Sequence, residues 1–88
     1  MSNGSVVSVW LFAWAREKIG KGLINVNVTV GVTLDKFLDD LFQNELKELY
    51  PKRKSFMIAV NNSYISQGGY ILKPGDEISI IPPVSGGM

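Results

Sequence analysis

The chain has 88 residues, 45% of them hydrophobic and 19% charged, with a net charge of +1 and neither histidine nor cysteine. This composition is typical of one globular domain with a modest core, and the charge gives no electrostatic basis for binding nucleic acid or acidic membranes. The missing cysteine and histidine exclude disulfides, thiolate nucleophiles, Ser-His dyads and most zinc sites. We therefore expect a carrier or binding module, with no metal site, no bound cofactor and no catalysis of its own.

The first apolar run, Val6 to Ala13, is rich in β-branched and aromatic residues and predicts a strand. Apolar residues on both faces indicate a central strand with a neighbour on each side. The apolar stretch from Val6 to Ala15 is too short to span a bilayer and lacks signal-peptide features, so a cytoplasmic protein is the expectation. A helical turn over 15–19 ends at Gly20. Clean alternation over Leu23 to Val30 predicts a half-buried strand, antiparallel to the first.

The apolar period becomes helical from Leu34. Thr33 is a suitable N-cap, and Tyr50-Pro51 is expected to end the helical region because proline disfavours helix at the residue before it. Residues spaced three and four apart form the apolar stripe of this helix. They are Leu34, Phe37, Leu38, Leu41, Phe42, Leu46 and Leu49.

The second half of the chain predicts further strands. Phe56 to Val60 is a short apolar strand, and after an asparagine-rich turn Tyr64-Ile65 returns as a brief edge strand. Lys73-Pro74-Gly75-Asp76 suits a type II turn. Glu77 to Ile81 alternates as a final strand until Pro82 stops the pairing.

This order of elements predicts an α+β fold of the β-grasp type, in which a mixed sheet of four to five strands carries one main helix across one face. The first and last strands are expected to pair in parallel at the sheet centre. We expect a single domain over residues 1–88, with a flexible C-terminal tail over 82–88.

Alternation along the two central strands places apolar residues on the open side of the sheet. If Ile78 and Ile80 face the helix, Ile81 faces outward, and by the same rule Trp10 and Phe12 face outward from the first strand. A large aromatic and an aliphatic side chain exposed together beside the tail indicate a docking patch for a partner. Partial coverage of this surface by loops is the alternative.

The last seven residues are the most informative motif, Pro82-Pro83-Val84-Ser85-Gly86-Gly87-Met88. Two prolines end the strand and stiffen the exit, and two glycines without side chains are able to thread a narrow channel. Such a tail is suited to insertion into the active site of another protein, with the chemistry at the main-chain carboxylate of Gly87. Met88 covers that carboxylate.

Several segments together resemble the MoaD-type sulfur carriers of the ubiquitin-like MoaD/ThiS family, and the resemblance spans nearly the whole chain. The specific part is the diproline tail preceded by Gly-Asp-Glu, because a terminal Gly-Gly alone is shared with ubiquitin and thiamine-pathway carriers. The matching segments are Leu11-Phe12-Ala13 with Arg16-Glu17, Ala59-Val60-Asn61, Gly75-Asp76-Glu77 and the tail from Pro82 to Gly87.

The resemblance implies the small subunit of molybdopterin synthase, a sulfur carrier of molybdenum cofactor biosynthesis. A MoeB-type E1-like enzyme would adenylate the Gly87 carboxyl with ATP before its conversion to a thiocarboxylate, with Gly86 giving clearance. The tail would then enter a MoaE-type large subunit and donate sulfur to cyclic pyranopterin monophosphate. A heterotetramer with two large subunits is also implied. The implied partner-binding residues are Phe12, Tyr64, Ile81, Pro82, Pro83, Val84 and Ser85.

Met88 departs from the family, which ends on its second glycine. Three explanations compete: a peptidase trims a precursor, the methionine is an artefact of expression, or this chain has kept only a binding role. Three other functions stay open: a ubiquitin-like protein modifier, a thiamine-pathway sulfur carrier and an interaction domain with a non-reactive tail. The Pro-Pro-Val-Ser spacer favours the molybdopterin carrier over the first two.

Overall fold

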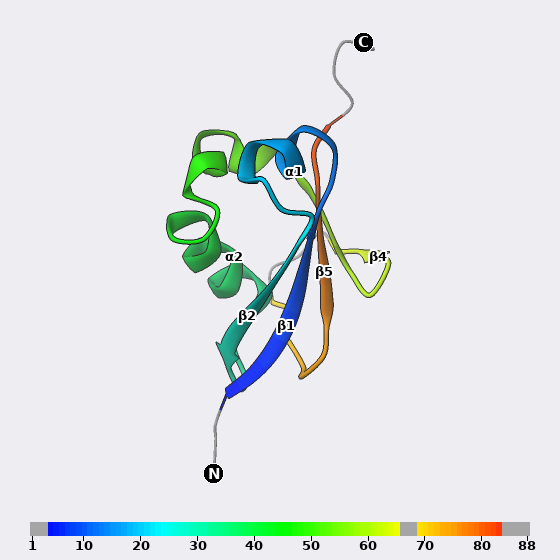
Figure 1. Cartoon of the computed structure of the whole chain (residues 1–88). Helices are drawn as coiled ribbons and strands as arrows, with labels where there is room; N and C mark the ends of the chain where they lie inside the picture. The colour runs from blue at the N-terminus through cyan, green and yellow to red at the C-terminus, as the bar shows by residue number, and fades with distance from the viewer. Residues whose placement is uncertain (1–3, 66–68, 84–88) are drawn as a thin grey trace.

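A five-stranded sheet carries all the helices on one of its faces, and the other face is open (Figure 1). The computed structural model describes residues 4–65 and 69–83. The elements, in chain order, are β1 (Gly4–Leu11), α1 (Ala13–Ile19), β2 (Leu23–Thr29), α2 (Leu34–Gln43), the 3₁₀ helix η1 (Lys47–Ser55), β3 (Met57–Val60), β4 (Ser63–Tyr64) and β5 (Glu77–Ile81).

The strand order is β2-β1-β5-β3-β4, and β1 pairs with β5 in parallel at the centre while the other pairings are antiparallel. This confirms the predicted α+β architecture with a mixed sheet. Val9 lies beside Ile78 and Leu11 beside Ile80. All four side chains are buried against the helices, as the alternation of the two strands predicted.

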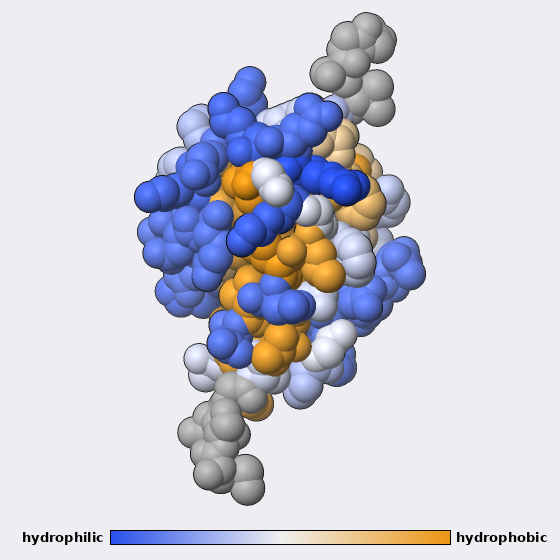
Figure 2. Space-filling view, in the orientation of Figure 1, coloured by the Kyte–Doolittle hydropathy of each residue, from blue (hydrophilic) through white to orange (hydrophobic). Residues whose placement is uncertain are grey.

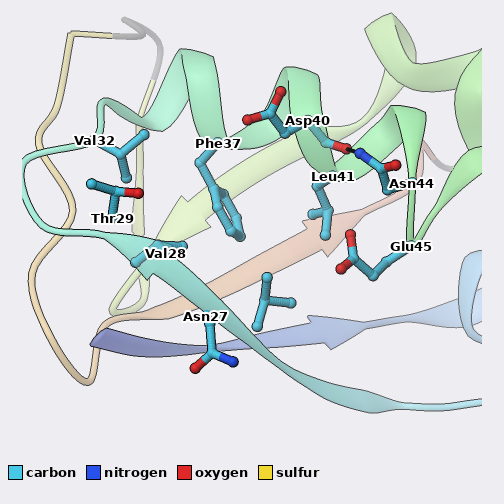
Figure 3. A pocket seen from close by; sticks show the side chains of 10 residues that line it. Asn27, Val28, Thr29, Val32, Phe37, Asp40, Leu41, Asn44 and Glu45 are labelled. Carbon is cyan, nitrogen blue, oxygen red and sulfur yellow. Dashed lines mark hydrogen bonds between the residues drawn. The ribbon is translucent and has the colours of Figure 1, made fainter. Parts of the chain in front are cut away.

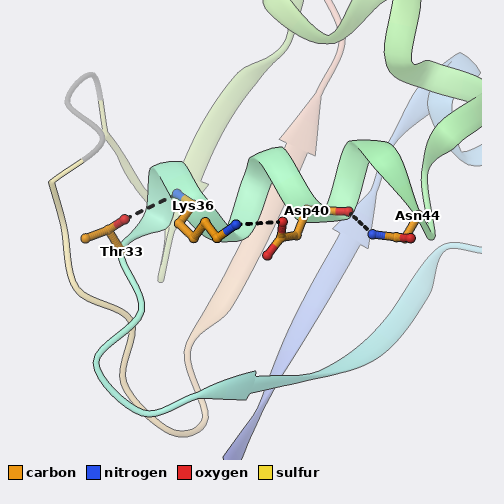
Figure 4. A network of polar contacts seen from close by, with 4 residues as sticks. All are labelled: Thr33, Lys36, Asp40 and Asn44. Atoms are coloured by element: carbon orange, nitrogen blue, oxygen red, sulfur yellow. Dashed lines mark hydrogen bonds and ion pairs between the residues drawn. The ribbon is translucent and has the colours of Figure 1, made fainter.

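Helix α2 begins where the sequence predicted. The side chain of Thr33 accepts a hydrogen bond from the Lys36 backbone N–H at 3.2 Å, the N-cap interaction that satisfies a free donor of the first turn (Figure 4). On the exposed face Lys36 pairs with Asp40 at 3.2 Å, and the Asn44 side chain donates to the Asp40 carbonyl oxygen. The predicted apolar stripe is buried except for Leu38, which is half-buried.

An aromatic cluster fixes the position of α1 over the core. The Trp14 ring lies 5.3 Å from the ring of Phe56, and Phe56 stacks on Phe42 with 5.8 Å between centroids. These three residues come from α1, the segment before β3, and α2. Such pairs add to the stabilisation from burial alone, so they join elements that are distant in the sequence.

Several predicted boundaries are wrong. Helix α2 ends at Gln43, before Leu46 and Leu49 of the predicted stripe, and β2 and β3 are each one residue shorter than predicted. β1 runs over Gly4–Leu11 instead of Val6 to Ala13, because Gly4 and Ser5 still pair with β2 and α1 begins at Ala13. The helical region also does not end at Tyr50-Pro51, since η1 continues through Pro51 to Ser55.

Proline lacks an N–H in either kind of helix, but its ring meets the carbonyl oxygen four residues earlier in the α-helix, and η1 is a 3₁₀ helix. Side chains also bind carbonyl oxygens of this segment: Arg53 donates to Tyr50 at 3.0 Å and Ser55 donates to Lys52 at 2.7 Å. The Arg53 guanidinium also lies 3.7 Å from the centre of the Tyr50 ring.

One buried carboxylate ties together the loops at the end of the sheet where β5 begins. Asp76 is 5% exposed and accepts hydrogen bonds from the Asn61 side chain at 2.9 Å, the Tyr70 hydroxyl at 3.1 Å and the Lys73 backbone N–H at 2.8 Å. Asn61 in turn accepts from the Glu77 N–H. Burial raises the pKa of Asp76, but these donors outweigh it and hold the pKa below the ordinary value.

Replacing Asp76 with asparagine is expected to lower the free energy of unfolding by roughly 2 kcal/mol at neutral pH. The side-chain NH₂ of the new asparagine would face N–H and O–H groups that now donate to the carboxylate, and two donors cannot bind each other. The depressed pKa means that Asp76 stabilises the fold above its unfolded-state pKa, and that this contribution is lost as the pH falls through the folded-state pKa. The difference between wild type and Asp76→Asn should therefore narrow below about pH 4. Urea unfolding across pH 3–7 measures this.

Asp39→Asn, on the exposed surface of α2, is the matched control and is expected to change stability by less than about 0.5 kcal/mol. An equal effect of the two substitutions would contradict the assigned role of Asp76.

Candidate functional site

The open face of the sheet carries an apolar band at the end where β1 and β5 finish. The strand register places Trp10 beside Ser79 and Met57 opposite Ile81, with Tyr64 opposite Ala59 in the next strand. Trp10, Met57 and Ile81 alternate along their strands with side chains that face the helices, so they lie on the open face, and Tyr64 shares that face. We name the outer patch by its six members, which are Trp10, Phe12, Leu23, Met57, Tyr64 and Ile81.

The outer patch is exposed to solvent. Trp10 is 37% exposed, Phe12 44%, Met57 47% and Tyr64 66%, while Ile81 is half-buried. The predicted outward orientation of Trp10, Phe12 and Ile81 is confirmed, and the described loops leave this surface open. A cluster of large apolar side chains of this kind indicates an interaction site more than scattered surface residues do.

A strained turn presents Phe12 beside β5. Phe12 has extended backbone angles, and its carbonyl oxygen accepts hydrogen bonds from the Ala15 and Arg16 N–H groups at 3.1 and 3.3 Å. The next residue, Ala13, has a φ of 53°, in the left-handed region that non-glycine residues rarely occupy. This turn redirects the chain from β1 into α1 and leaves the Phe12 side chain at the edge of the patch.

The start of the tail lies against the helical layer. Pro82 is buried and Pro83 is exposed. Pro83 lines a cleft of about 570 Å³ together with Trp14, Pro51 and the long side chains of Lys18 and Lys52. The chain thus leaves the sheet between the outer patch and the helical layer.

The structure brings together Phe12, Ile81 and the start of the tail, and it places Tyr64 two strands further along the same face. Val84, Ser85, Gly86, Gly87 and Met88 lie outside the described residues. Within residues 4–65 and 69–83, no group of acidic side chains could hold a metal ion. In that same part of the chain, no helix has the length and hydropathy that crossing a membrane requires.

Sequence reasoning missed two members of the outer patch, Met57 and Leu23. The register places them on this face, because Met57 lies opposite Ile81 and Leu23 lies opposite Trp10. It also missed that Asn61 and Asp76, two residues of the motifs singled out above, bind each other.

Comparisons with known proteins agree on the family. The model of the ThiS family matches residues 9–87. A molybdopterin synthase sulfur carrier subunit from Dictyostelium discoideum is 38% identical over 84 residues, which are 90% of this chain and 93% of that protein. The crystal structure of SAMP1 from Haloferax volcanii is 24% identical, with a TM-score of 0.82 over 93% of this chain and 99% of that one. This last likeness shows the ubiquitin-like fold.

A protein–protein complex of subunits 1 and 2 of the molybdopterin-converting factor from Helicobacter pylori contains a similar chain. It is 29% identical, with a TM-score of 0.62 over 92% of this chain and 97% of that one.

The left-handed turn beside Phe12 leads to a stability prediction. Ala13→Gly is expected to raise the free energy of unfolding by roughly 0.5 kcal/mol, because relief of the positive φ exceeds the entropy that glycine adds to the unfolded state. Ala13→Val should lower it by about 1–2 kcal/mol. Ala15→Gly, at a buried helical position, is the control and should lower stability by about 1 kcal/mol. Thermal unfolding distinguishes these outcomes. A lower stability of Ala13→Gly would contradict the inference that the backbone at Ala13 is strained.

Proposed function

The chain belongs to the ThiS family, and we propose that it acts as the sulfur carrier subunit of a molybdopterin synthase. The observation that carries this proposal is the position of the outer patch at the same end of the sheet as the start of the tail. A partner that holds Phe12 and Ile81 is well placed to receive the residues after Pro83. The Dictyostelium relative, matched over nearly the whole length of both chains, has this function by name.

The chemistry resides in the C-terminal carboxyl of Gly87. A carboxylate is a poor electrophile, so it first attacks the α-phosphate of ATP on an E1-like enzyme and releases pyrophosphate. A sulfur nucleophile at the oxidation level of sulfide then attacks the carbonyl carbon of the acyl adenylate. The new C–S bond replaces the C–O bond to AMP, which leaves, and a thiocarboxylate remains. This thiocarboxylate donates its sulfur to cyclic pyranopterin monophosphate.

A small subunit of molybdopterin synthase implies a large subunit as its partner. We extend this to a MoaE-type large subunit that supplies the catalytic residues, a MoeB-type adenylating enzyme, and a heterotetramer with two large subunits. The cytoplasmic location belongs to the same proposal. The absence of histidine and cysteine from the whole sequence supports this division of roles, because these two residue types are frequent general bases and nucleophiles in enzymes that work at neutral pH.

Phe12, Tyr64 and Ile81 are proposed to contact both partners. The aromatic side chains offer a large contact area at a low entropy cost, and their neighbours on the sheet are held by backbone pairing on both sides. Use of one surface for both partners would make activation and sulfur transfer alternate, since a carrier bound to one enzyme is hidden from the other.

A ubiquitin-like modifier remains the second candidate, because it would use the same fold and the same activated glycine. The two functions differ in the acceptor, which is a lysine amine for the modifier and a pterin carbon for the carrier. The Dictyostelium relative favours the carrier.

We expect Phe12→Ala and Ile81→Ala to weaken binding to the large subunit by roughly 30-fold, the effect of losing an interface anchor worth about 2 kcal/mol. Stability should fall by no more than about 1 kcal/mol, because Phe12 is exposed and Ile81 is half-buried. Titration calorimetry and thermal unfolding measure the two quantities. Val30→Ala is the control, because Val30 is 61% exposed but follows the opposite end of β2. A large loss of stability with unchanged affinity would place the two side chains in the core.

The function itself is tested with a chain that ends at Gly87. Incubation with the E1-like enzyme, ATP and a sulfide source should convert it to a thiocarboxylate, detected by intact mass spectrometry. The chain that ends at Met88 should stay unmodified, because its Gly87 carbonyl is an amide. Gly87→Ala should lower sulfur transfer roughly 100-fold through misplacement in a narrow channel, with stability unchanged. Thiocarboxylation without sulfur transfer to the pterin, combined with adducts on lysines, would favour the modifier instead.

A further inference from the structure

The two edges of the sheet are built differently. At one edge β4 has only two residues, and short strands are a usual way of blocking unwanted pairing. At the other edge β2 has seven residues, Leu23–Thr29, with no charged residue, proline or glycine among them. Natural sheets usually protect such an edge with charges, bulges or a covering segment. β2 therefore offers a strand that is able to pair with another chain.

The register shows which backbone groups of β2 face the free edge. The Leu11 N–H donates to the Gly22 carbonyl oxygen at 2.9 Å, and bonded and non-bonded pairs alternate along an antiparallel ladder. The even-numbered residues of β2 therefore bond to β1. The N–H and C=O groups of Leu23, Asn25 and Asn27 point away from the sheet, where an added strand would meet them.

A cleft of about 250 Å³, lined by both apolar and polar side chains, opens beside this edge, between β2 and α2 (Figure 3). Phe37 and Leu41 point from α2 toward β2, and Val28 points back toward the helix, while the side chain of Asn27 points away from it. The inward residues of β2 are only half-buried, so an apolar band crossed by hydrophilic residues shows at the surface in Figure 2. The side chains of a strand added to β2 would cover this cleft.

The charge of the cleft indicates what kind of strand fits. Asp40 and Glu45 line it, and among the described residues no lysine or arginine does. Asp40 already pairs with Lys36 at 3.2 Å, so an incoming cation would meet the Glu45 carboxylate and share Asp40 with Lys36. A second copy of this chain is a poor occupant, because its own β2 carries no cation and self-pairing would bring the acidic margins together.

We propose that β2 and the cleft bind an extended segment of another protein, with apolar side chains at alternate positions and lysine or arginine on the same face. The segment pairs with Leu23, Asn25 and Asn27 through its backbone, and its apolar side chains cover the half-buried Val26 and Val28. Its cations reach Glu45 and share Asp40 with Lys36. This site uses the backbone of Leu23, whose side chain belongs to the outer patch, but it uses neither the tail nor Phe12 and Ile81, so it does not rest on the proposed carrier function.

The probe is a fluorescein-labelled peptide, Lys-Thr-Val-Thr-Val-Thr-Val-Thr-Lys, in which the lysines and valines share one face. Fluorescence anisotropy measures its affinity, and a peptide with glutamate in place of lysine is the control. We expect saturable binding of the lysine peptide, at least tenfold tighter than the glutamate peptide. In NMR spectra the amides of Leu23, Asn25 and Asn27 should shift and become protected from hydrogen exchange.

Asn27→Pro removes an outward N–H without touching the bonds to β1, and it should weaken binding at least tenfold. Asn27→Thr keeps that N–H and should bind like the wild type. Thermal unfolding establishes that the proline variant is folded. Glu45→Lys, an exposed position outside any strand, gives a second test that does not depend on proline: it should narrow or reverse the preference for the lysine peptide.

Four results would overturn the proposal. They are no binding at millimolar peptide, equal affinities of the proline and threonine variants, shifts centred on Phe12 and Ile81, and a dimer in sedimentation that Asn27→Pro dissociates. The last result would assign the edge to a second copy of this chain. A chain ending at Gly87 that carries Asn27→Pro should still form the thiocarboxylate, which separates failure at this site from failure of the carrier function.

Discussion

The parallel pairing of β1 with β5 is the constraint on which the arrangement of this molecule depends. Parallel neighbours run in the same direction, so β1 and β5 finish at the same end of the sheet. Phe12, which follows β1, and Pro82, which follows β5, are therefore close in space although the whole chain separates them. An antiparallel pairing of the same strands would have put the apolar contact residues at the opposite end from the tail. The intervening segments return the chain, as a parallel connection requires.

The two faces of the sheet have different roles: the inner face stabilises the fold, and the outer face offers a surface for recognition. The inner face buries side chains such as Val9 and Ile80, and the aromatic cluster around Phe56 joins the helices to it. The outer face leaves large apolar side chains in water, which contributes little to folding. The Asp76 network lies at the end of β5 remote from the outer patch, so it holds the strand in register without occupying the surface that a partner needs.

Much of the fold was predictable because burial imposes periods on the sequence. The alternation of Ile78 to Ile81 predicted the orientation of β5, and the stripe beginning at Leu34 predicted α2. Features that leave no periodic pattern of apolar residues in the sequence were not predictable. The bond between Asn61 and Asp76 joins residues 15 apart, and β3 is only four residues long, too short for its alternation to place Met57 outside. Pro51 misled because the rule against proline describes α-helices, whereas this segment is a 3₁₀ helix.

Two surfaces of this chain differ in their chemistry, and that chemistry decides what each surface is able to bind. The outer patch is apolar and aromatic, whereas the cleft beside β2 has carboxylates at its margin and free backbone groups along one side. The first selects a partner by shape and buried area, and the second selects an extended cationic strand. The cleft lies on the helical side of the sheet and the outer patch on the other. A partner strand at β2 would therefore leave Phe12 and Ile81 accessible, and the carrier would be able to hold both ligands at once.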